Sequence, residues 1–186
     1  MFEYIHIFVF VDILIKGKNI SLRALEPGDI DHLYKWENDT SIWQVSNSLT
    51  PYSRHILEQY VLNADQDIYT AKQLRLVICL NNDRKPIGCI DLFDFDPQHR
   101  RAGIGILIAD ETERGKGHSS EALSLLINYA FNTLNLHQLY SNVGANNDHS
   151  IKLFKKNYFT EVGIKKDWIK KGRGWENELL LQRINK

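Results

Sequence analysis

Residues 101–120 read RAGIGILIADETERGKGHSS, and this stretch determines how the rest of the chain is interpreted. Residues 102–109 form an uncharged run of apolar residues and glycine, which is typical of a strand covered on both faces. Two glycines and two cations follow within residues 114–119, just before a segment, 120–131, whose apolar residues recur at helical spacing. The sequence therefore predicts a buried strand, a glycine loop and a helix in direct succession.

A glycine loop that opens a helix is suited to hold a phosphate group. The first N–H groups of a helix are unpaired and lie at the positive end of its dipole, so they attract anions. Arg114 and Lys116 would add positive charge, and Ser119 or Ser120 a hydroxyl donor. The alternative is an ordinary helix start with a capping serine.

Two well-known phosphate loops do not fit these residues. A Walker loop has glycine five residues before its Gly-Lys pair, where this chain has Asp110, and Gly117 follows Lys116 in place of serine or threonine. The dinucleotide fingerprint needs glycine at its sixth position, which after Gly115 is Ser120. The loop belongs to another class.

The loop resembles the pyrophosphate loop of the GNAT superfamily of N-acetyltransferases, whose pattern is Gln or Arg, two residues, Gly, one residue, then Gly or Ala. Arg114, Gly117 and Ser119 occupy these places, with serine as a departure at the last. Asn147 and Ser150 resemble the second signature of the same superfamily. The similarity covers about residues 19–184 and is greatest to the RimJ/RimL-like branch, which includes ribosomal-protein N-terminal and spermidine or diamine N-acetyltransferases.

The order of elements predicts one α/β (α+β) domain over residues 19–186, with residues 1–18 as an N-terminal extension. Its mixed sheet is expected to contain about seven strands with helices on both faces. Besides the central strand, strands are expected at 20–25, 74–80, 87–93, 138–145, 162–170 and 175–184. The resemblance further implies that the central strands splay apart.

Composition excludes several other classes of protein. The 186 residues carry 23 Lys plus Arg and 23 Asp plus Glu, so the basic excess of a nucleic-acid-binding protein is absent. The apolar start contains His6 and Asp12 and is shorter than the roughly 20 residues that span a membrane. Cys79 and Cys89 have no metal or redox spacing, which favours reduced core thiols, no metal and a cytoplasmic location. The sequence leaves open whether the chain forms a homo-oligomer.

The resemblance implies acetyl-coenzyme A as the co-substrate. In the superfamily, the central strand supplies a backbone N–H to the thioester oxygen where it splays from its neighbour, and Ile108 is the expected donor here. The residues expected to hold the coenzyme are Leu107, Ile108, Ala109, Arg114, Gly115, Lys116, Gly117, His118, Ser119, Ser120, Asn147 and Ser150.

An amine acceptor needs a base and a binding site for its positive charge. A primary amine has a pKa of about 10, so it must lose a proton before attack. Asp91 and Asp94 are the candidate bases, and they face opposite sides of a strand unless a bulge intervenes. Trp36, Glu37 and Trp43, together with Asp91, are the candidate acceptor-binding residues. The alternatives are helix packing for the aromatics and solvated or arginine-paired carboxylates.

The expected general acid is missing from this chain. Four residues after the signature serine, where the superfamily commonly has a tyrosine, stands Phe154. Tyr158, one turn further, could replace it, or no acid is needed because a thiol pKa of about 8.5 makes thiolate an acceptable leaving group. The favoured interpretation is transfer of acetyl to a polyamine or diamine such as spermidine. The alternatives are a protein N-terminus, for instance of a ribosomal protein, and a non-catalytic coenzyme-binding module.

Overall fold

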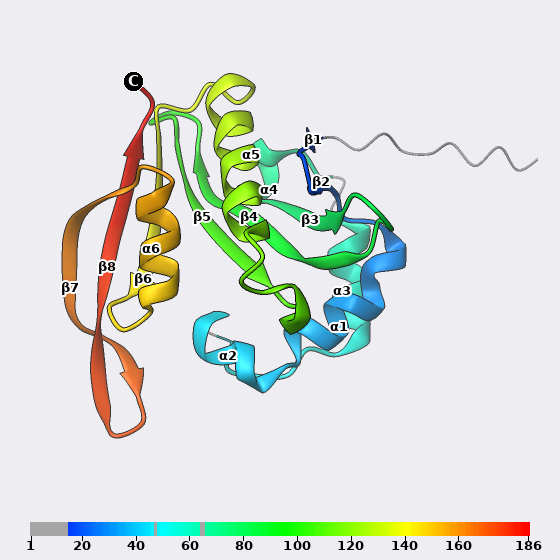
Figure 1. Ribbon diagram of the computed structural model, residues 1–186. Helices are drawn as coiled ribbons and strands as arrows, with labels where there is room; N and C mark the ends of the chain where they lie inside the picture. Colours follow the sequence, from blue (N-terminus) through cyan, green and yellow to red (C-terminus); the bar gives the residue numbers. More distant parts are fainter. Residues whose placement is uncertain (1–14, 47, 64–65) are drawn as a thin grey trace, which may run out of the picture.

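The computed structural model describes residues 15–46, 48–63 and 66–186, and within them a single mixed sheet carries helices on both faces (Figure 1). Strand order is β1-β2-β3-β4-β5-β6-β8-β7. All neighbouring strands pair antiparallel except β5 and β6, which are parallel. The predicted α/β fold is confirmed, and most of the expected N-terminal extension lies outside the described residues.

Most elements lie where the sequence predicts them. The strands are β1 Ile15–Lys16, β2 Ile20–Ala24, β3 Leu74–Leu80, β4 Pro86–Asp96, β5 Arg101–Ile108, β6 Gln138–Gly144, β7 Thr160–Lys171 and β8 Gly174–Ile184. The helices are α1 Ile30–Glu37, α2 Thr40–Ser46, α3 Arg54–Leu62, α4 Ile68–Ala71, α5 His118–Asn132 and α6 Asp148–Lys156. The short strand β1 gives the described sheet eight strands. None of the helices in the described part of the chain has the length and hydropathy needed to cross a bilayer.

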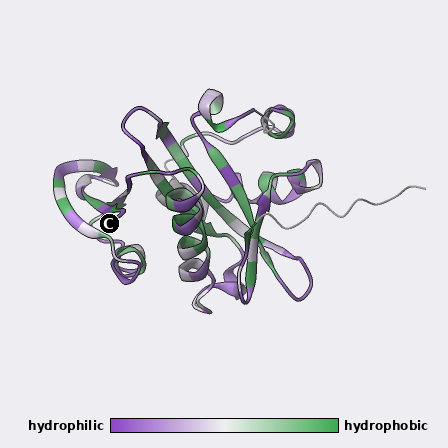
Figure 2. Cartoon of the chain, turned by 90° about the horizontal axis from the view of Figure 1, so that it is seen from above, coloured by the Kyte–Doolittle hydropathy of each residue, from purple (hydrophilic) through white to green (hydrophobic). Residues whose placement is uncertain are grey.

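Two hydrophobic clusters cover the two faces of the sheet. On one face, α5 and α6 pack on the strands through residues such as Leu123, Leu126 and Phe154. On the other face, α1, α2 and α3 pack on β3 and β4 around Leu33 and Leu57. Viewed from above, hydrophobic residues follow the central strands and hydrophilic residues the outer loops (Figure 2). The central strands β3 and β4 and the first half of β5 are therefore covered on both sides, in keeping with the uncharged β5 sequence, whereas β7 at the edge is largely exposed.

The sheet is divided between β5 and β6. Their parallel pairing covers only Arg101–Gly103 against Gln138–Tyr140, and beyond Gly103 the two strands diverge. In Figure 1, β6, β8, β7 and α6 lean away from the half that contains β1–β5. Ser141 bridges the start of the opening, since its buried hydroxyl donates to the Ile104 carbonyl oxygen at 3.0 Å. This divergence confirms the predicted splay and leaves one edge of β5 without a partner strand.

Close packing between β4 and β5 depends on glycine. A Cβ built on Gly88 would lie 2.0 Å from the carbonyl oxygen of Leu107, and one on Gly103 would lie 2.3 Å from the ring of Phe93. The backbone oxygen cannot move aside without disturbing the ladder, in which Gly88 pairs with Ile108. Gly88 therefore fixes the end of β5 that leads into the glycine loop.

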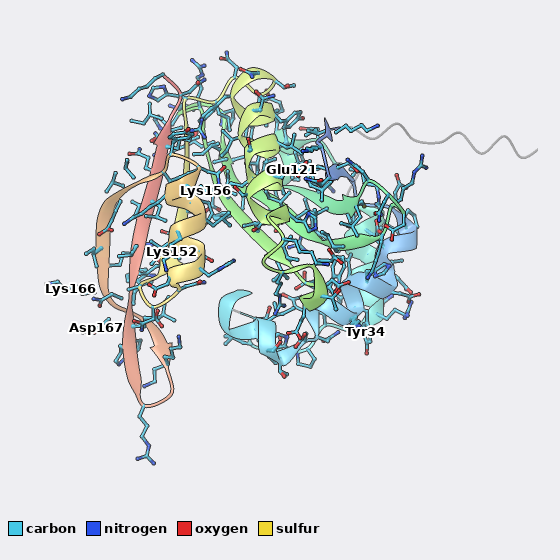
Figure 3. The ribbon with its side chains drawn as sticks, viewed as in Figure 1. Tyr34, Glu121, Lys152, Lys156, Lys166 and Asp167 are labelled. Atoms are coloured by element: carbon cyan, nitrogen blue, oxygen red, sulfur yellow. The ribbon has the colours of Figure 1, made fainter. Side chains whose placement is uncertain are left out.

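The first turn of α5 is tied to β2 across the surface of the sheet. One carboxylate oxygen of Glu121 accepts hydrogen bonds from the backbone amides of Asn19 at 2.8 Å and Ile20 at 3.4 Å. The other accepts from the Asn19 side chain at 2.9 Å. Figure 3 labels Glu121 on the side of α5 that faces β2. The carboxylate thus joins the start of the helix to the start of a strand.

We expect Gly88→Ala to lower the free energy of unfolding by about 2 kcal/mol or more, because the added methyl overlaps a backbone oxygen. Gly163→Ala is the matched control, since a Cβ there meets nothing within 4 Å. Urea denaturation of both variants measures the difference. Equal losses would contradict the role of Gly88 in strand approach.

Candidate active site

The loop before α5 presents a row of unpaired backbone amides. Gly115 and Gly117 have φ values of +76° and +90°, which L side chains rarely adopt. Within the described chain, the amides of residues 115–120 donate no hydrogen bond, while the next amide, that of Glu121, bonds to the Gly117 carbonyl. Six consecutive free donors at a helix start are suited to bind an anion, and the loop that the sequence singles out is where they lie. The helix begins at His118, two residues earlier than expected.

The loop cations are paired with loop carboxylates. The Arg114 guanidinium bonds to Glu111 at 2.9 Å, and the Lys116 ammonium bonds to Glu113 at 2.9 Å. His118 is buried, with Nε2 3.2 Å from the second oxygen of Glu113. Because carboxylates neutralise these two cations, the backbone amides contribute more to anion binding at this loop than the sequence suggests. Exposed ion pairs of this kind are worth only about 0–1 kcal/mol, so Lys116 can turn toward a bound phosphate, whereas Arg114 is also bonded to the Ile108 and Ala109 carbonyls.

The open edge of β5 begins where its pairing with β6 ends. Alternation along an antiparallel strand turns every second residue toward the gap. Arg114 donates to the Ile108 carbonyl at 2.9 Å from this side, whereas the Ala109 amide donates to Ile87 on β4 at 2.9 Å. The Ile108 N–H therefore faces the gap. The amides of Leu107 and Ala109 face β4, so among these three residues it is Ile108, the expected donor, whose N–H faces the gap.

An arginine that the sequence analysis missed joins two of the predicted acceptor-site carboxylates. Arg75 on β3 donates to both oxygens of Asp91, at 2.8 and 3.1 Å, and to Glu37 at 2.7 Å. Its guanidinium also lies 5.5 Å from the ring centre of Tyr60. The register of the β3–β4 hairpin pairs Arg75 with Asp91 directly, so a cation opposite the candidate base was the available clue. Asp91 itself pairs with Gly105 on β5, which has no side chain.

A bulge brings the second candidate base to the same face. The register of β4 shifts between Phe93 and Asp96, and Asp94 has a φ of +48°. The Tyr140 hydroxyl donates to Asp94 at 3.0 Å, and its ring packs edge to face with Phe93. Burial and the bond to Asp94 raise the pKa of Tyr140 to about 12, so the phenol stays protonated at neutral pH. Asp91 and Asp94 therefore share one face, because the bulge cancels their alternation.

The predicted aromatic residues separate into core and surface. Trp36 is buried in the cluster under α1 and stacks on His32 at 5.5 Å, so the structure corrects the expectation that it contacts the acceptor. Trp43 is half-buried, and its indole N–H donates to the Glu37 carbonyl at 2.7 Å. Trp43 and Glu37 therefore remain together at the end of α1.

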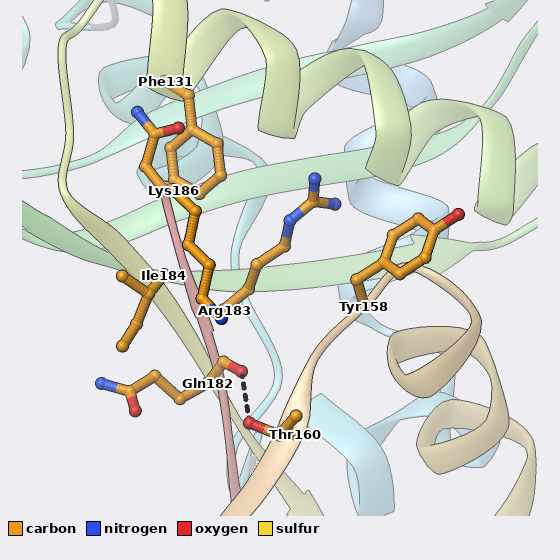
Figure 4. A pocket seen from close by; sticks show the side chains of 8 residues that line it. Phe131, Tyr158, Thr160, Gln182, Arg183, Ile184 and Lys186 are labelled. Carbon is orange, nitrogen blue, oxygen red and sulfur yellow. Dashed lines mark hydrogen bonds between the residues drawn. The ribbon is translucent and has the colours of Figure 1, made fainter.

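The structure does not support Tyr158 as the general acid. Helix α6 ends at Lys156, and Tyr158 has a φ of +63°, so it does not continue the helix face. Its largely exposed ring borders a cavity of about 400 Å³ with Phe131 from the last turn of α5 and Arg183 from β8 (Figure 4). Phe154 is 3% exposed and packs edge to face on Phe159. This part of the prediction is wrong because the chain turns before residue 158.

The second signature caps a helix. The side-chain oxygen of Asn147 accepts from the Ser150 amide at 3.1 Å, so α6 begins at Asp148. Cys79 and Cys89 are buried free thiols on neighbouring strands, and burial raises both pKa values. In the described ranges, no group of three His, Cys, Asp or Glu side chains is arranged to hold a metal ion.

A divided sheet with a loop of free amides and an open strand edge beside carboxylates suits an acyltransferase that uses coenzyme A. Residues 19–160 match the family model described as "Acetyltransferase (GNAT) domain". The chain belongs to the GNAT family and is an acetyl-CoA-dependent N-acetyltransferase.

Several known proteins are similar to this chain over most of its length. The spermidine N(1)-acetyltransferase of Escherichia coli K12 is 28% identical over 145 residues, 78% of this chain and 75% of the relative. The uncharacterized N-acetyltransferase p20 of Bacillus licheniformis is 30% identical, with 84% and 88% covered. The crystal structure of spermidine N-acetyltransferase from Vibrio cholerae with CoA and spermine has a TM-score of 0.81 at 24% identity, covering 90% of this chain and 96% of that one. A further structure of the V. cholerae enzyme is dodecameric.

We expect Gly117→Glu to abolish acetyl-CoA binding, because it adds a carboxylate and a side chain beside the six free amides that are the predicted site for the diphosphate. Gly172→Glu in the β7–β8 turn is the matched control, since Gly172 also has positive φ, +58°, and open space around it. Calorimetric titration should give a loss of at least about 100-fold for the first variant and none for the second. Unchanged affinity in Gly117→Glu would contradict the loop assignment.

Proposed function

We propose that the protein transfers acetyl from acetyl-CoA to a primary amine of a polyamine or diamine such as spermidine. The observation that carries this proposal is the pair of carboxylates, Glu37 and Asp91, at the face of β4 beside Gly105. Both side chains are about one-fifth exposed and are held together by Arg75. A partly buried site with net negative charge attracts an ammonium group. The spermidine-acetylating relatives support the same class of acceptor.

In this proposal the coenzyme lies along the open edge of β5. The amides of residues 115–120 hold its diphosphate, and the N–H of Ile108 donates to the thioester oxygen, on which negative charge develops during attack. Asn147 and Ser150, at the start of α6, border the other side of the opening. Bound acetyl-CoA supplies an activated acetyl group as a thioester. The chain contributes alignment, hydrogen bonds and exclusion of water.

Asp91 is our candidate for the group that accepts the proton from the amine, directly or through water. It lies opposite Gly105, three residues along β5 from Ile108, whereas Asp94 lies beyond the Phe93–Gly103 pair. Each oxygen of Asp91 accepts one bond from Arg75, and a carboxylate has about four acceptor positions, so capacity for the acceptor remains. Asp94, bonded to Tyr140, is assigned to the more distant end of the acceptor.

The departing thiolate needs no dedicated acid in this scheme. Phe154 has no proton to donate, and the hydroxyl of Tyr158 lies outside the helix. With a thiol pKa of about 8.5, coenzyme A leaves as thiolate and is protonated by water. The reaction then depends on deprotonation of the amine and on the oxyanion contact at Ile108.

Two alternatives remain open. A protein N-terminus carries a primary amine too, and the half-exposed aromatic Trp43 beside Glu37 suits a peptide as well as a polyamine. Phe154 in place of tyrosine favours the other alternative, a coenzyme-binding module without catalysis. Whether the chain assembles as the V. cholerae enzyme does stays a prediction.

We expect release of free thiol from acetyl-CoA with spermidine at a rate well above that with a Ser- or Ala-starting peptide and above that without acceptor. A thiol-reactive dye measures all three rates. Faster release with the peptide would favour the N-terminal acetyltransferase. Coenzyme binding without acceptor-dependent release would favour the non-catalytic module.

We expect Asp91→Asn to lower kcat/KM for the accepted amine by about 100-fold or more, since an amide cannot take the proton. Asp94→Asn, a substitution of the same kind on the same strand and face, should cost less than about tenfold. Steady-state kinetics with saturating acetyl-CoA compares the two. The opposite order would transfer the role of base to Asp94.

A further inference from the structure

The two carboxylates proposed to bind the acceptor amine, Glu37 and Asp91, are already paired with a cation of the protein, Arg75. Three nitrogens of Arg75 contact carboxylate oxygens of Glu37 and Asp91 at 2.7 to 3.1 Å. The three side chains are between 19% and 22% exposed, so water screens them only partly. Arg75 is thus the counter-ion of both carboxylates.

The net charge of this cluster follows directly from its members. Two carboxylates and one guanidinium leave a single negative charge. Tyr60, which packs against the guanidinium, adds none, because burial raises the pKa of its phenol and keeps it neutral. A site with one net negative charge in a partly desolvated setting balances one ammonium group. A second ammonium in the same site would meet the guanidinium as a like charge.

We propose that Arg75 determines acceptor specificity by limiting the site to one ammonium group. The proposal rests on the assignment of the Glu37–Asp91 face to the acceptor amine. It predicts a substrate class in which the reacting amine enters alone and any further positive charge stays several bonds away, outside the cluster. A second ammonium of a diamine gains nothing from the cluster itself and is stabilised only by groups outside it, such as Asp94.

A purely structural role for Arg75 is the competing explanation, since its contacts also join α1 to β3 and β4. The chain contains a matched ion pair for this comparison. Arg23 on β2 makes a two-pronged contact with buried Asp29, at 2.6 and 2.7 Å, and bonds to neither Glu37 nor Asp91. Arg23→Gln removes the same kind of interaction while leaving every contact of Glu37 and Asp91 with Arg75 in place.

The experiment measures binding of butylamine and 1,4-diaminobutane by calorimetry with the protein saturated with coenzyme A. The two amines have the same carbon chain and differ by one ammonium. In Arg75→Gln, where the net charge becomes two negative, we expect the diamine-to-monoamine affinity ratio to rise about tenfold over the parent protein. Arg75→Lys and Arg23→Gln should keep the ratio within about threefold of the parent.

An unchanged ratio in Arg75→Gln overturns the proposal and leaves the proposed function intact. If Arg75→Gln does not fold, Glu37→Gln provides the test, because it leaves the cluster neutral and should weaken butylamine binding at least tenfold. Unchanged binding in Glu37→Gln also overturns the proposal. Absence of both binding and acetylation of any amine by the parent protein overturns the acceptor assignment together with this inference.

Discussion

The interruption of backbone pairing between β5 and β6 is the constraint on which the rest of the structure depends. A buried strand normally satisfies its N–H and C=O groups on both sides, and leaving them unpaired is costly. Here Ser141 and Arg114 each satisfy one carbonyl of β5, those of Ile104 and Ile108, at the two ends of the opening. The amides of Ile106 and Ile108, which alternate away from β4, stay free for a ligand. The unpaired amides of β5 are therefore available to bind a ligand, and the side chains of Ser141 and Arg114 satisfy the carbonyls at the two ends of the opening.

The glycine loop extends this arrangement beyond the strand. Arg114 bonds to the last carbonyls of β5 and to Glu111, and so fixes the loop to the strand end. Positive φ at Gly115 and Gly117 then turns consecutive amides outward. The strand edge and the loop thus present two separate groups of free donors, because most amides of residues 109–114 between them are bonded within the protein. The carboxylates of the acceptor face lie on the opposite side of the sheet, so the two substrates would meet at the edge of β5.

The sequence predicted the features that depend on neighbouring residues and missed the contacts between residues that are distant in the chain. The buried strand, the glycines and the helix after them are neighbours in the chain, so their order was sufficient. Arg75 and Tyr140 were missed because their partners are 16 to 46 residues away. The bulge at Asp94 overrode the alternation rule. Tyr158 was misplaced because helical spacing was extended from Phe154 beyond the end of α6 at Lys156, to a residue with a φ of +63°.

The bond between Glu121 and the start of β2 has a thermodynamic consequence. Because the same helical turn offers amides to an anion and a carboxylate to Asn19 and Ile20, order at one end stabilises order at the other. Such linkage is reciprocal: whatever the diphosphate gains from a firmly seated β2, β2 gains equally from the diphosphate. Slower hydrogen exchange at the Asn19 and Ile20 amides on loading with coenzyme would be its direct expression. Hydrogen exchange at the start of β2 would then reveal whether coenzyme is bound at the glycine loop, although β2 does not contact it.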